Sequence, residues 1–328
     1  MNKKALLYTA LTALLCLLVG CGRQKEPEQF EKQALYFDTV IQIRFYADEN
    51  GEELMQRCME MCDAMEKTFS RTDSESELYA VNHRQQDTVE VSAGIAELVK
   101  VGLDYYEKSG GKFDITIAPL SDLWDFKSED ARVPEAGAIE EALQKVDAAK
   151  VHVDGNVLRF DSPDTMIDLG ALVKGYAADR LKAYLTSQGV TSGLINLGGN
   201  VLAIGTKPDG SNWNIGIQKP FGDYGDSSAV VEVDDQTVVS SGIYERYFEQ
   251  NGVLYHHILD PDTGYPVQSD IEGVSVISDT SLTGDALSTS CLALGFEEAK
   301  ELIGKIEGAE AVFVLKDGTL AYTDETMR

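Results

Sequence analysis

The order of strand-like and helix-like segments is the feature that most constrains the fold of this chain of 328 residues. Short segments typical of strands follow one another between residues 193 and 277, and helical patterns lie before and after them. Segregated runs of strands and helices predict an α+β fold, and short turns between successive strands favour antiparallel pairing. We therefore expect mainly antiparallel sheets with packed helices.

Two sets of segments follow from these patterns. The expected helices cover residues 51–69, 91–109, 133–148, 172–188, 282–294 and 297–306. The expected strands cover residues 35–46, 151–153, 157–160, 193–197, 201–204, 213–218, 229–233, 237–240, 254–259, 273–277, 311–315 and 319–323. Asp154-Gly155-Asn156 is a strong hairpin signal, and the last two strands turn at Lys316-Asp317-Gly318.

The N-terminus has the pattern of an export signal. Lys3 and Lys4 precede an apolar run, residues 5–19, which is short for a spanning helix and typical of a signal peptide. Leu18-Val19-Gly20-Cys21 resembles a bacterial lipobox, which implies cleavage before Cys21 and lipidation of its thiol. An ordinary signal peptide with an incidental cysteine is the alternative interpretation.

Three parts of the chain follow from this interpretation. Residues 1–20 are the expected signal peptide, and residues 21–33, which are polar and include Pro27, are the expected lipidated, flexible tether. Residues 34–328 are the expected folded domain. Lipid chains on Cys21 would anchor it to the extracytoplasmic face of the cell membrane.

The charge of the chain excludes one class of partner. Its net charge is −27, so it does not bind nucleic acid by neutralising phosphates. The same charge opposes binding of a phosphate ligand, and a divalent cation would remove this difficulty. Cys58 and Cys62 stand four residues apart in a helical pattern, and we expect them in the core rather than in a disulfide.

Residues 168–180 form an informative junction. Asp168 ends a short apolar run, Gly170 permits a tight turn, and a helix follows in which Lys174 lies near the start. The free amides at the start of a helix, together with a lysine and a carboxylate acceptor, could hold a phosphate and a polar ring edge. A capped core helix with a solvated lysine is the alternative.

Further clusters carry residues suited to ligand binding. Residues 110–120 interrupt an apolar segment with glycines and Pro119, and their exposed backbone could bind a planar heterocycle. His256 and His257 precede an Asp-Pro turn, and a histidine can accept a proton near neutral pH. Asp285 and Thr289 share one helix face, where their oxygens suit Mg²⁺. Each cluster also has a purely structural interpretation.

Taken together, the clusters resemble the ApbE family of FAD:protein FMN transferases, from about Tyr36 to the C-terminus. Five blocks occur in the family's order: Ser70-Arg71-Thr72-Asp73 with Ser76-Glu77-Leu78 and Asn82; Phe113-Asp114-Ile115-Thr116 with Pro119-Leu120 and Leu123-Trp124; Asp168 to Asp179; Ser241-Gly242 with Tyr244-Glu245-Arg246 and His257 to Pro266; and Asp285 to Thr289. The resemblance implies a single catalytic unit of the ApbE type, related to the T-fold.

The resemblance also implies an activity. FMN would pass from FAD to a threonine hydroxyl of an acceptor protein, AMP would leave, and Mg²⁺ would be required. The acceptor would be an extracytoplasmic, redox-active protein with an exposed threonine motif, and no such motif is evident in this chain. The rival interpretations are an FAD pyrophosphatase, in which water attacks, a non-catalytic FAD-binding lipoprotein, and a structural or adhesive surface lipoprotein.

Residue roles are carried over from the same resemblance. His257, Asp285 and Lys174 would be catalytic, with His257 accepting the threonine proton; Asp260 and a metal-bound water are alternative bases. The implied Mg²⁺ ligands are the Ala171 carbonyl, Asp285 and Thr289. The implied FAD contacts are Phe37, Thr39, Ser76, Ala118, Pro119, Leu120, Asp168, Lys174, His257 and Leu259.

This chain departs from the family pattern at two places. The family usually opens with Met-Gly-Thr, whereas this chain has Phe37-Asp38-Thr39. The Phe37 ring could stack on isoalloxazine or partly fill the pocket. Asp125 stands where the family usually has glycine.

Overall fold

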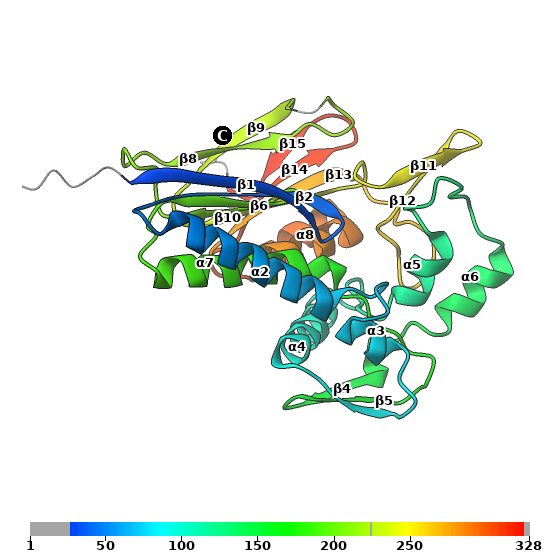
Figure 1. Ribbon diagram of the computed structural model, residues 1–328. Coiled ribbons are helices and arrows are strands. Elements are labelled where there is room, and N and C mark those ends of the chain that lie inside the picture. The colour runs from blue at the N-terminus through cyan, green and yellow to red at the C-terminus, as the bar shows by residue number, and fades with distance from the viewer. Residues whose placement is uncertain (1–26, 224, 325–328) are drawn as a thin grey trace, which may run out of the picture.

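An eight-stranded antiparallel sheet is the centre of the computed structural model, which describes residues 27–223 and 225–324 (Figure 1). The predicted signal peptide over residues 1–20 and the predicted lipidation site Cys21 lie outside these residues. In spatial order the strands are β1 (Glu28–Tyr36), β2 (Thr39–Ala47), β6 (Gly193–Leu197), β7 (Asn200–Ile204), β10 (Thr237–Gly242), β13 (Ile271–Ser278), β14 (Glu310–Leu315) and β15 (Leu320–Tyr322).

One face of this sheet carries the helices that form the main core. Strand β2 shows why: Ile41, Ile43 and Phe45 alternate inward and are fully buried, whereas Gln42 and Arg44 face outward and bond to Glu31 of β1. The covering helices are α2 (Gly51–Phe69), α7 (Gly170–Ser187), α8 (Ser281–Leu294) and α9 (Phe296–Ile303) (Figure 1).

A two-stranded ribbon covers part of the opposite face. Strands β8 (Trp213–Gln218) and β9 (Ser227–Val233) pair with each other and pack a second apolar cluster onto the sheet. Trp213 and Ile217 of β8 are almost fully buried in this cluster, together with Val238 of β10 and Ile277 of β13. The sheet is therefore buried on both faces over its central strands.

A smaller lobe follows α2 in the sequence and lies beside the end of the sheet (Figure 1). Its helices are α3 (Glu77–Asn82), α4 (Ala93–Lys108), α5 (Ala118–Trp124) and α6 (Ala136–Leu143), with a 3-10 turn over Ala148–Lys150. Its strands are β3 (Thr88–Glu90), β4 (Val151–Asp154) and β5 (Val157–Phe160). A ribbon of β11 (Tyr247–Gln250) and β12 (Val253–His256) packs against α5 through Trp124, Phe248 and Tyr255.

The structure confirms the predicted α+β class and most of the predicted segments, but it corrects the N-terminal region. The tether was expected to end at residue 33, whereas β1 already begins at Glu28. The single strand expected over residues 35–46 covers the end of β1, the turn at Phe37 and Asp38, and nearly all of β2. Only Phe30, Ala34 and Tyr36 of β1 face the core. Most other residues of this edge strand are polar and exposed, so its sequence resembles that of a flexible tether.

Two further expectations concern cysteines and membrane spans. Cys58, Cys62 and Cys291 are buried and unpaired within the part of the chain that the structure describes, as the helical spacing of the first two predicted. Burial raises the pKa of both Cys58 and Cys62 to about 12, which is the behaviour of inert core thiols. Among the helices over residues 27–324, none combines the length and the apolar character that a bilayer span requires.

Candidate active site

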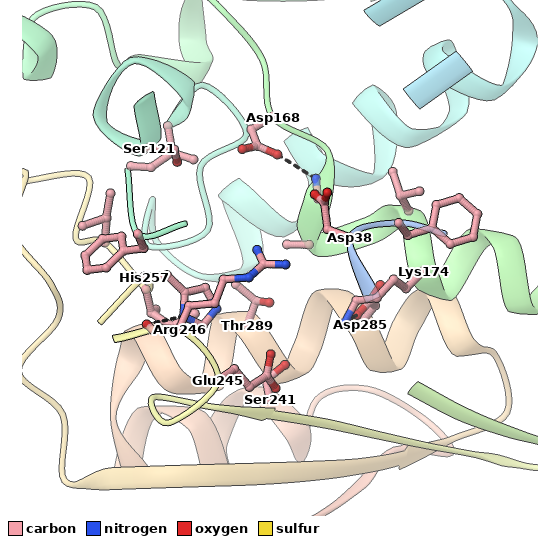
Figure 2. A pocket seen from close by; sticks show the side chains of 18 of the residues that line it. Asp38, Ser121, Asp168, Lys174, Ser241, Glu245, Arg246, His257, Asp285 and Thr289 are labelled. Carbon is pink, nitrogen blue, oxygen red and sulfur yellow. Dashed lines mark hydrogen bonds and ion pairs between the residues drawn. The ribbon is translucent and has the colours of Figure 1, made fainter. Parts of the chain in front are cut away.

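A cavity of about 900 Å³ lies between the end of the sheet and the smaller lobe. Its floor is formed by the first turn of α7 and by α8, and includes Ala171, Lys174, Asp285 and Thr289. Its roof is the segment from Lys112 to Lys127, which enters and follows α5. Figure 2 shows Lys174 and Asp285 at one side of the floor and His257 with Arg246 at the other.

The floor depends on a close contact between α7 and α8. A Cβ atom on Gly175 would lie 2.4 Å from the Ser281 carbonyl oxygen and 2.7 Å from the Leu282 Cα, so only glycine permits this approach. Asp179, one turn later, accepts hydrogen bonds from the amides of Ser281 and Leu282 at 2.8 and 2.9 Å. The start of α8 is thereby fixed against α7, 102 residues away in the sequence.

Asp285 is the most deeply placed charged group of the floor. Its side chain is 2% exposed, its Oδ2 accepts from the Gly175 amide at 2.8 Å, and its Oδ1 lies 4.0 Å from Lys174 Nζ. Burial raises the pKa of Asp285, and the neighbouring Lys174 opposes that rise. A second cation would stabilise the charged form of this buried carboxylate, because the single lysine lies at the limit of ion-pair distance.

His257 follows directly after β12 and lies across the floor from Asp285. Its Nδ1 is 3.3 Å from the carbonyl oxygen of Arg246, and its backbone amide donates to the same oxygen at 3.1 Å. A carbonyl oxygen only accepts, so the contact assigns the ring proton to Nδ1 and leaves a lone pair on Nε2. Burial lowers the pKa of His257 to about 3, with the Arg246 charge as the next cause, so the ring is uncharged at neutral pH.

Asp168 links the floor to the roof. Its Oδ1 accepts from the Gly170 amide at 2.8 Å, and its Oδ2 accepts from Arg71 Nε at 3.0 Å. Arg71 also donates to Asp122 of the roof. The amides at the start of α7 were expected to be free for an anion, but Asp168 already engages that of Gly170, as a short Asp-turn permits.

The comparisons with known proteins agree with one another. Residues 37–313 match the ApbE family. This chain belongs to the ApbE family. It is 32% identical to the FAD:protein FMN transferase of Treponema pallidum, over 96% of this chain and 93% of that protein. It is 34% identical to an FAD:protein FMN transferase of Klebsiella pneumoniae, over 88% of this chain and 90% of that one.

A solved structure extends the likeness to three dimensions. The crystal structure of the ApbE protein from Thermotoga maritima superposes with a TM-score of 0.84 at 31% sequence identity, and the match covers 92% of this chain and all of that one. The family resemblance inferred from the five blocks and the mainly antiparallel α+β fold are both confirmed.

The floor offers oxygen donors to a metal ion. Across residues 27–223 and 225–324, no three His, Cys, Asp or Glu side chains gather into a metal cluster. Asp285 and Thr289, one helical turn apart, both line the cavity, as does Ala171. In a regular helix the Gly175 amide would donate to the Ala171 carbonyl, and here that amide is engaged by Asp285. One carboxylate, one hydroxyl and one carbonyl with spare acceptor capacity suit Mg²⁺.

Phe37 and Asp38, which depart from the ApbE pattern, lie in the β1–β2 turn. Phe37 and Asp38 have φ of 54° and 58°, a left-handed conformation that is unusual for a bulky residue such as phenylalanine. The Phe37 amide donates to Glu66 at 2.9 Å, and Asp38 forms an ion pair with Lys127 of the roof. Phe37, Asp38 and Thr39 all line the cavity, and the turn is therefore held from two sides.

Four of the predicted FAD contacts do not line the cavity. Ser76 is 2% exposed and caps α3, accepting from the Tyr79 amide at 3.0 Å. Ala118 and Leu120 are fully buried, Leu120 in the apolar cluster around Trp124, and Pro119 at the start of α5 does not line the cavity. Their neighbours Ile117 and Ser121 line it instead, because successive residues of a helix point in different directions.

The other predicted contacts do line the cavity: Phe37, Thr39, Asp168, Lys174, His257 and Leu259. Asp260, the alternative base, accepts from Lys112 at 2.9 Å and is not among the lining residues, so the geometry favours His257. Sequence reasoning assigned no role to Arg71, Glu245 or Arg246, although all three lie in the quoted family blocks. Burial raises the pKa of Glu245, a further carboxyl among the residues that line the cavity.

Proposed function

We propose that this protein is an FAD:protein FMN transferase, which moves FMN from FAD to a threonine hydroxyl of an acceptor protein and releases AMP. One observation carries the proposal: Asp285 and Thr289 of the floor line the same cavity as His257. The His257 ring is uncharged, and its Nε2 carries no proton. The family and the names of its relatives support the same activity.

The cavity suits a dinucleotide. Its volume of about 900 Å³ lies near the upper end of the ~300–1,000 Å³ of small-molecule sites. FAD has a central diphosphate between two planar ring systems, and the cavity places a charged floor between the β1–β2 turn and the roof. The diphosphate would lie over the floor, where Lys174 offers a positive charge.

Mg²⁺ fits the floor. The Asp285 carboxylate, the Thr289 hydroxyl and the Ala171 carbonyl would hold it, and these are the hard oxygen donors that this ion prefers. When bound, the ion would neutralise diphosphate charge that a chain of net charge −27 otherwise repels.

The transfer forms one P–O bond and breaks another. The threonine oxygen bonds to the FMN phosphorus, the diphosphate bond breaks, and AMP leaves with the electron pair. His257 is the group placed to accept the hydroxyl proton at Nε2, because its Nδ1–H is fixed by the Arg246 carbonyl. Phosphoryl transfer depends mainly on positioning and charge stabilisation, and Lys174 and Asp168 supply these at the floor.

Incubation with FAD, Mg²⁺ and candidate extracytoplasmic redox proteins tests the proposal. We expect one acceptor to gain the mass of one FMN group and in-gel flavin fluorescence, with equimolar AMP, and its threonine-to-valine variant to gain neither. Free FMN and AMP without an adduct would identify a pyrophosphatase. Bound, intact FAD would identify a flavin-binding protein, and absence of thermal stabilisation by FAD would support a structural or adhesive role.

The cellular location is part of the proposal. Lipidation of Cys21 would place the enzyme on the extracytoplasmic face of the membrane, beside acceptors of the same compartment. Six residues would then lie between the anchor and the start of β1 at Glu28, and the seven Cα–Cα steps would reach at most about 25 Å. Replacement of Cys21 by serine should release the protein from the membrane fraction, and unchanged membrane retention would contradict the anchor.

A further inference from the structure

The positively charged side chains that line the cavity differ in whether a carboxylate pairs with them. Of the five lysines and arginines that line it within the described residues, four are engaged by carboxylates. These four are Arg71 with Asp122 and Asp168, Lys112 with Asp260 and Asp262, Lys127 with Asp38, and Lys174 beside Asp285.

Arg246 is the fifth; Glu245 and Asp38 interact with its charge, but no carboxylate among the described residues lies within ion-pair distance of its guanidinium. Within residues 27–223 and 225–324, it forms neither an ion pair nor a side-chain hydrogen bond. Figure 2 shows the side chain extending into the open centre of the cavity. Its backbone is fixed, because the Arg246 carbonyl oxygen accepts from both the amide and Nδ1 of His257. The residue thus presents an anchored, unpaired guanidinium to whatever occupies the cavity.

The neighbourhood of Arg246 indicates which anion it takes. A guanidinium binds phosphate oxygens through two parallel hydrogen bonds. A general base must lie beside the phosphorus whose nucleophile it deprotonates, and His257 is held by Arg246 itself. Lys174 and Asp285 lie at the other side of the floor (Figure 2). The two phosphates of one dinucleotide would therefore meet different groups.

We propose that the Arg246 guanidinium binds the phosphoryl group of the FMN half of FAD, the group that is transferred. This assignment rests on the proposed function. While the threonine oxygen bonds to phosphorus and AMP leaves with the electron pair, Arg246 stays on the non-bridging oxygens of the transferred group. The AMP phosphate remains at the Lys174 side and departs from there.

Binding measurements on Arg246→Gln test the assignment. Titrations with FAD, FMN, AMP and riboflavin in the presence of Mg²⁺ separate the contributions, because FMN and riboflavin differ only by the phosphate. We expect the affinity for FAD and FMN to fall tenfold or more, the affinity for AMP less than threefold, and the affinity for riboflavin less than twofold. Arg246→Lys, which keeps a point charge, should recover part of the FMN affinity.

Lys127→Gln is the matched control, since it removes the same charge from a roof lysine that already forms an ion pair with Asp38. We expect it to weaken FMN binding less than threefold. Unchanged FMN affinity in Arg246→Gln, or an equal loss for FMN and riboflavin, would overturn the assignment while leaving the proposed function in place. A wild-type protein that bound neither FAD nor FMN would overturn both. Thermal unfolding of each apo variant checks that the fold is retained.

Discussion

The floor and the roof of the cavity are held by different interactions. In the floor, the backbone positions the functional group: Gly175 lets α8 touch α7, and the Gly175 amide binds Asp285 directly. The roof is anchored near its start, where the Ile115 carbonyl oxygen accepts from the Asp168 amide at 2.7 Å. Further along, side-chain ion pairs join it to the other elements around the cavity, Arg71 with Asp122 and Lys127 with Asp38. Buried backbone contacts fix a position more firmly than exposed ion pairs do. The floor is therefore suited to chemistry and the roof to covering a ligand.

Asp285→Asn should produce the largest contrast between function and stability. Loss of the carboxylate should lower flavin transfer about 1,000-fold or more, since a bound metal contributes several kcal/mol. The apo protein should remain as stable as the wild type or gain stability, because a buried charge disappears while the asparagine oxygen can still accept from Gly175. AMP release and thermal unfolding measure the two effects. Full activity would reject the role of the floor in metal binding.

His257→Gln should separate chemistry from binding. Removal of the proposed base should reduce turnover by about 100-fold to 1,000-fold, while the FAD dissociation constant changes less than threefold. Single-turnover kinetics and FAD titration give these two values. Equal losses of turnover and affinity would instead assign His257 to ligand binding.

The same variant should change the pH dependence of stability. The pKa of His257 is about 3 in the folded protein, against about 6.5 when unfolded, so the unfolded state binds the proton first as pH falls. The wild type should therefore lose about 2 kcal/mol relative to His257→Gln between pH 6.5 and pH 4.5. Denaturant unfolding at both pH values measures this difference. An equal change in unfolding free energy for the wild type and the variant would contradict a buried, uncharged ring.

Leu120→Ala should damage the roof without affecting the ligand site. The side chain is fully buried, so its truncation should cost about 2–5 kcal/mol of unfolding free energy. FAD affinity measured well below the melting temperature should change less than threefold, because the neighbours Ile117 and Ser121 form the lining. A large loss of FAD affinity in a folded variant would restore Leu120 as a contact.

Gly175→Ala should disturb the floor through a single methyl group. Its contact with the Ser281 carbonyl should cost about 1–3 kcal/mol and reduce flavin transfer by displacing Asp285. Gly137→Ala in α6 is the control, because no atom beyond its chain neighbours and the backbone of its own helix lies within 4 Å of an added Cβ, and it should stabilise the protein by up to about 1 kcal/mol. Similar stability of the two variants would show that the α7–α8 contact can relax.

The sequence predicted the floor better than the roof for a physical reason. Asp285 and Thr289 are four residues apart in a helix, and this spacing alone places them on one face. Leu120, in contrast, stands within a motif whose residues alternate between the cavity and the core, and a sequence does not specify which side each faces. The ion pair of Arg71 with Asp168 joins positions 97 residues apart, and no local pattern predicts it.

Some of the missed features did carry a local signal. Ser76 is a helix cap, and serine is among the residues preferred at that position. Pro119 at the start of α5 is typical of the first turn of a helix, although no helix was expected over this segment. Strand β1 alternates Phe30, Ala34 and Tyr36 toward the core only weakly, because an edge strand leaves its other face in water.

A crystal structure with FAD and Mg²⁺ tests the central claim most directly. We expect the FAD diphosphate over the floor, with a cation bound by the Asp285 carboxylate, the Thr289 hydroxyl and the Ala171 carbonyl. His257 Nε2 should lie beside the FMN phosphorus. A diphosphate bound outside the cavity, or a cation held by other residues, would contradict the account.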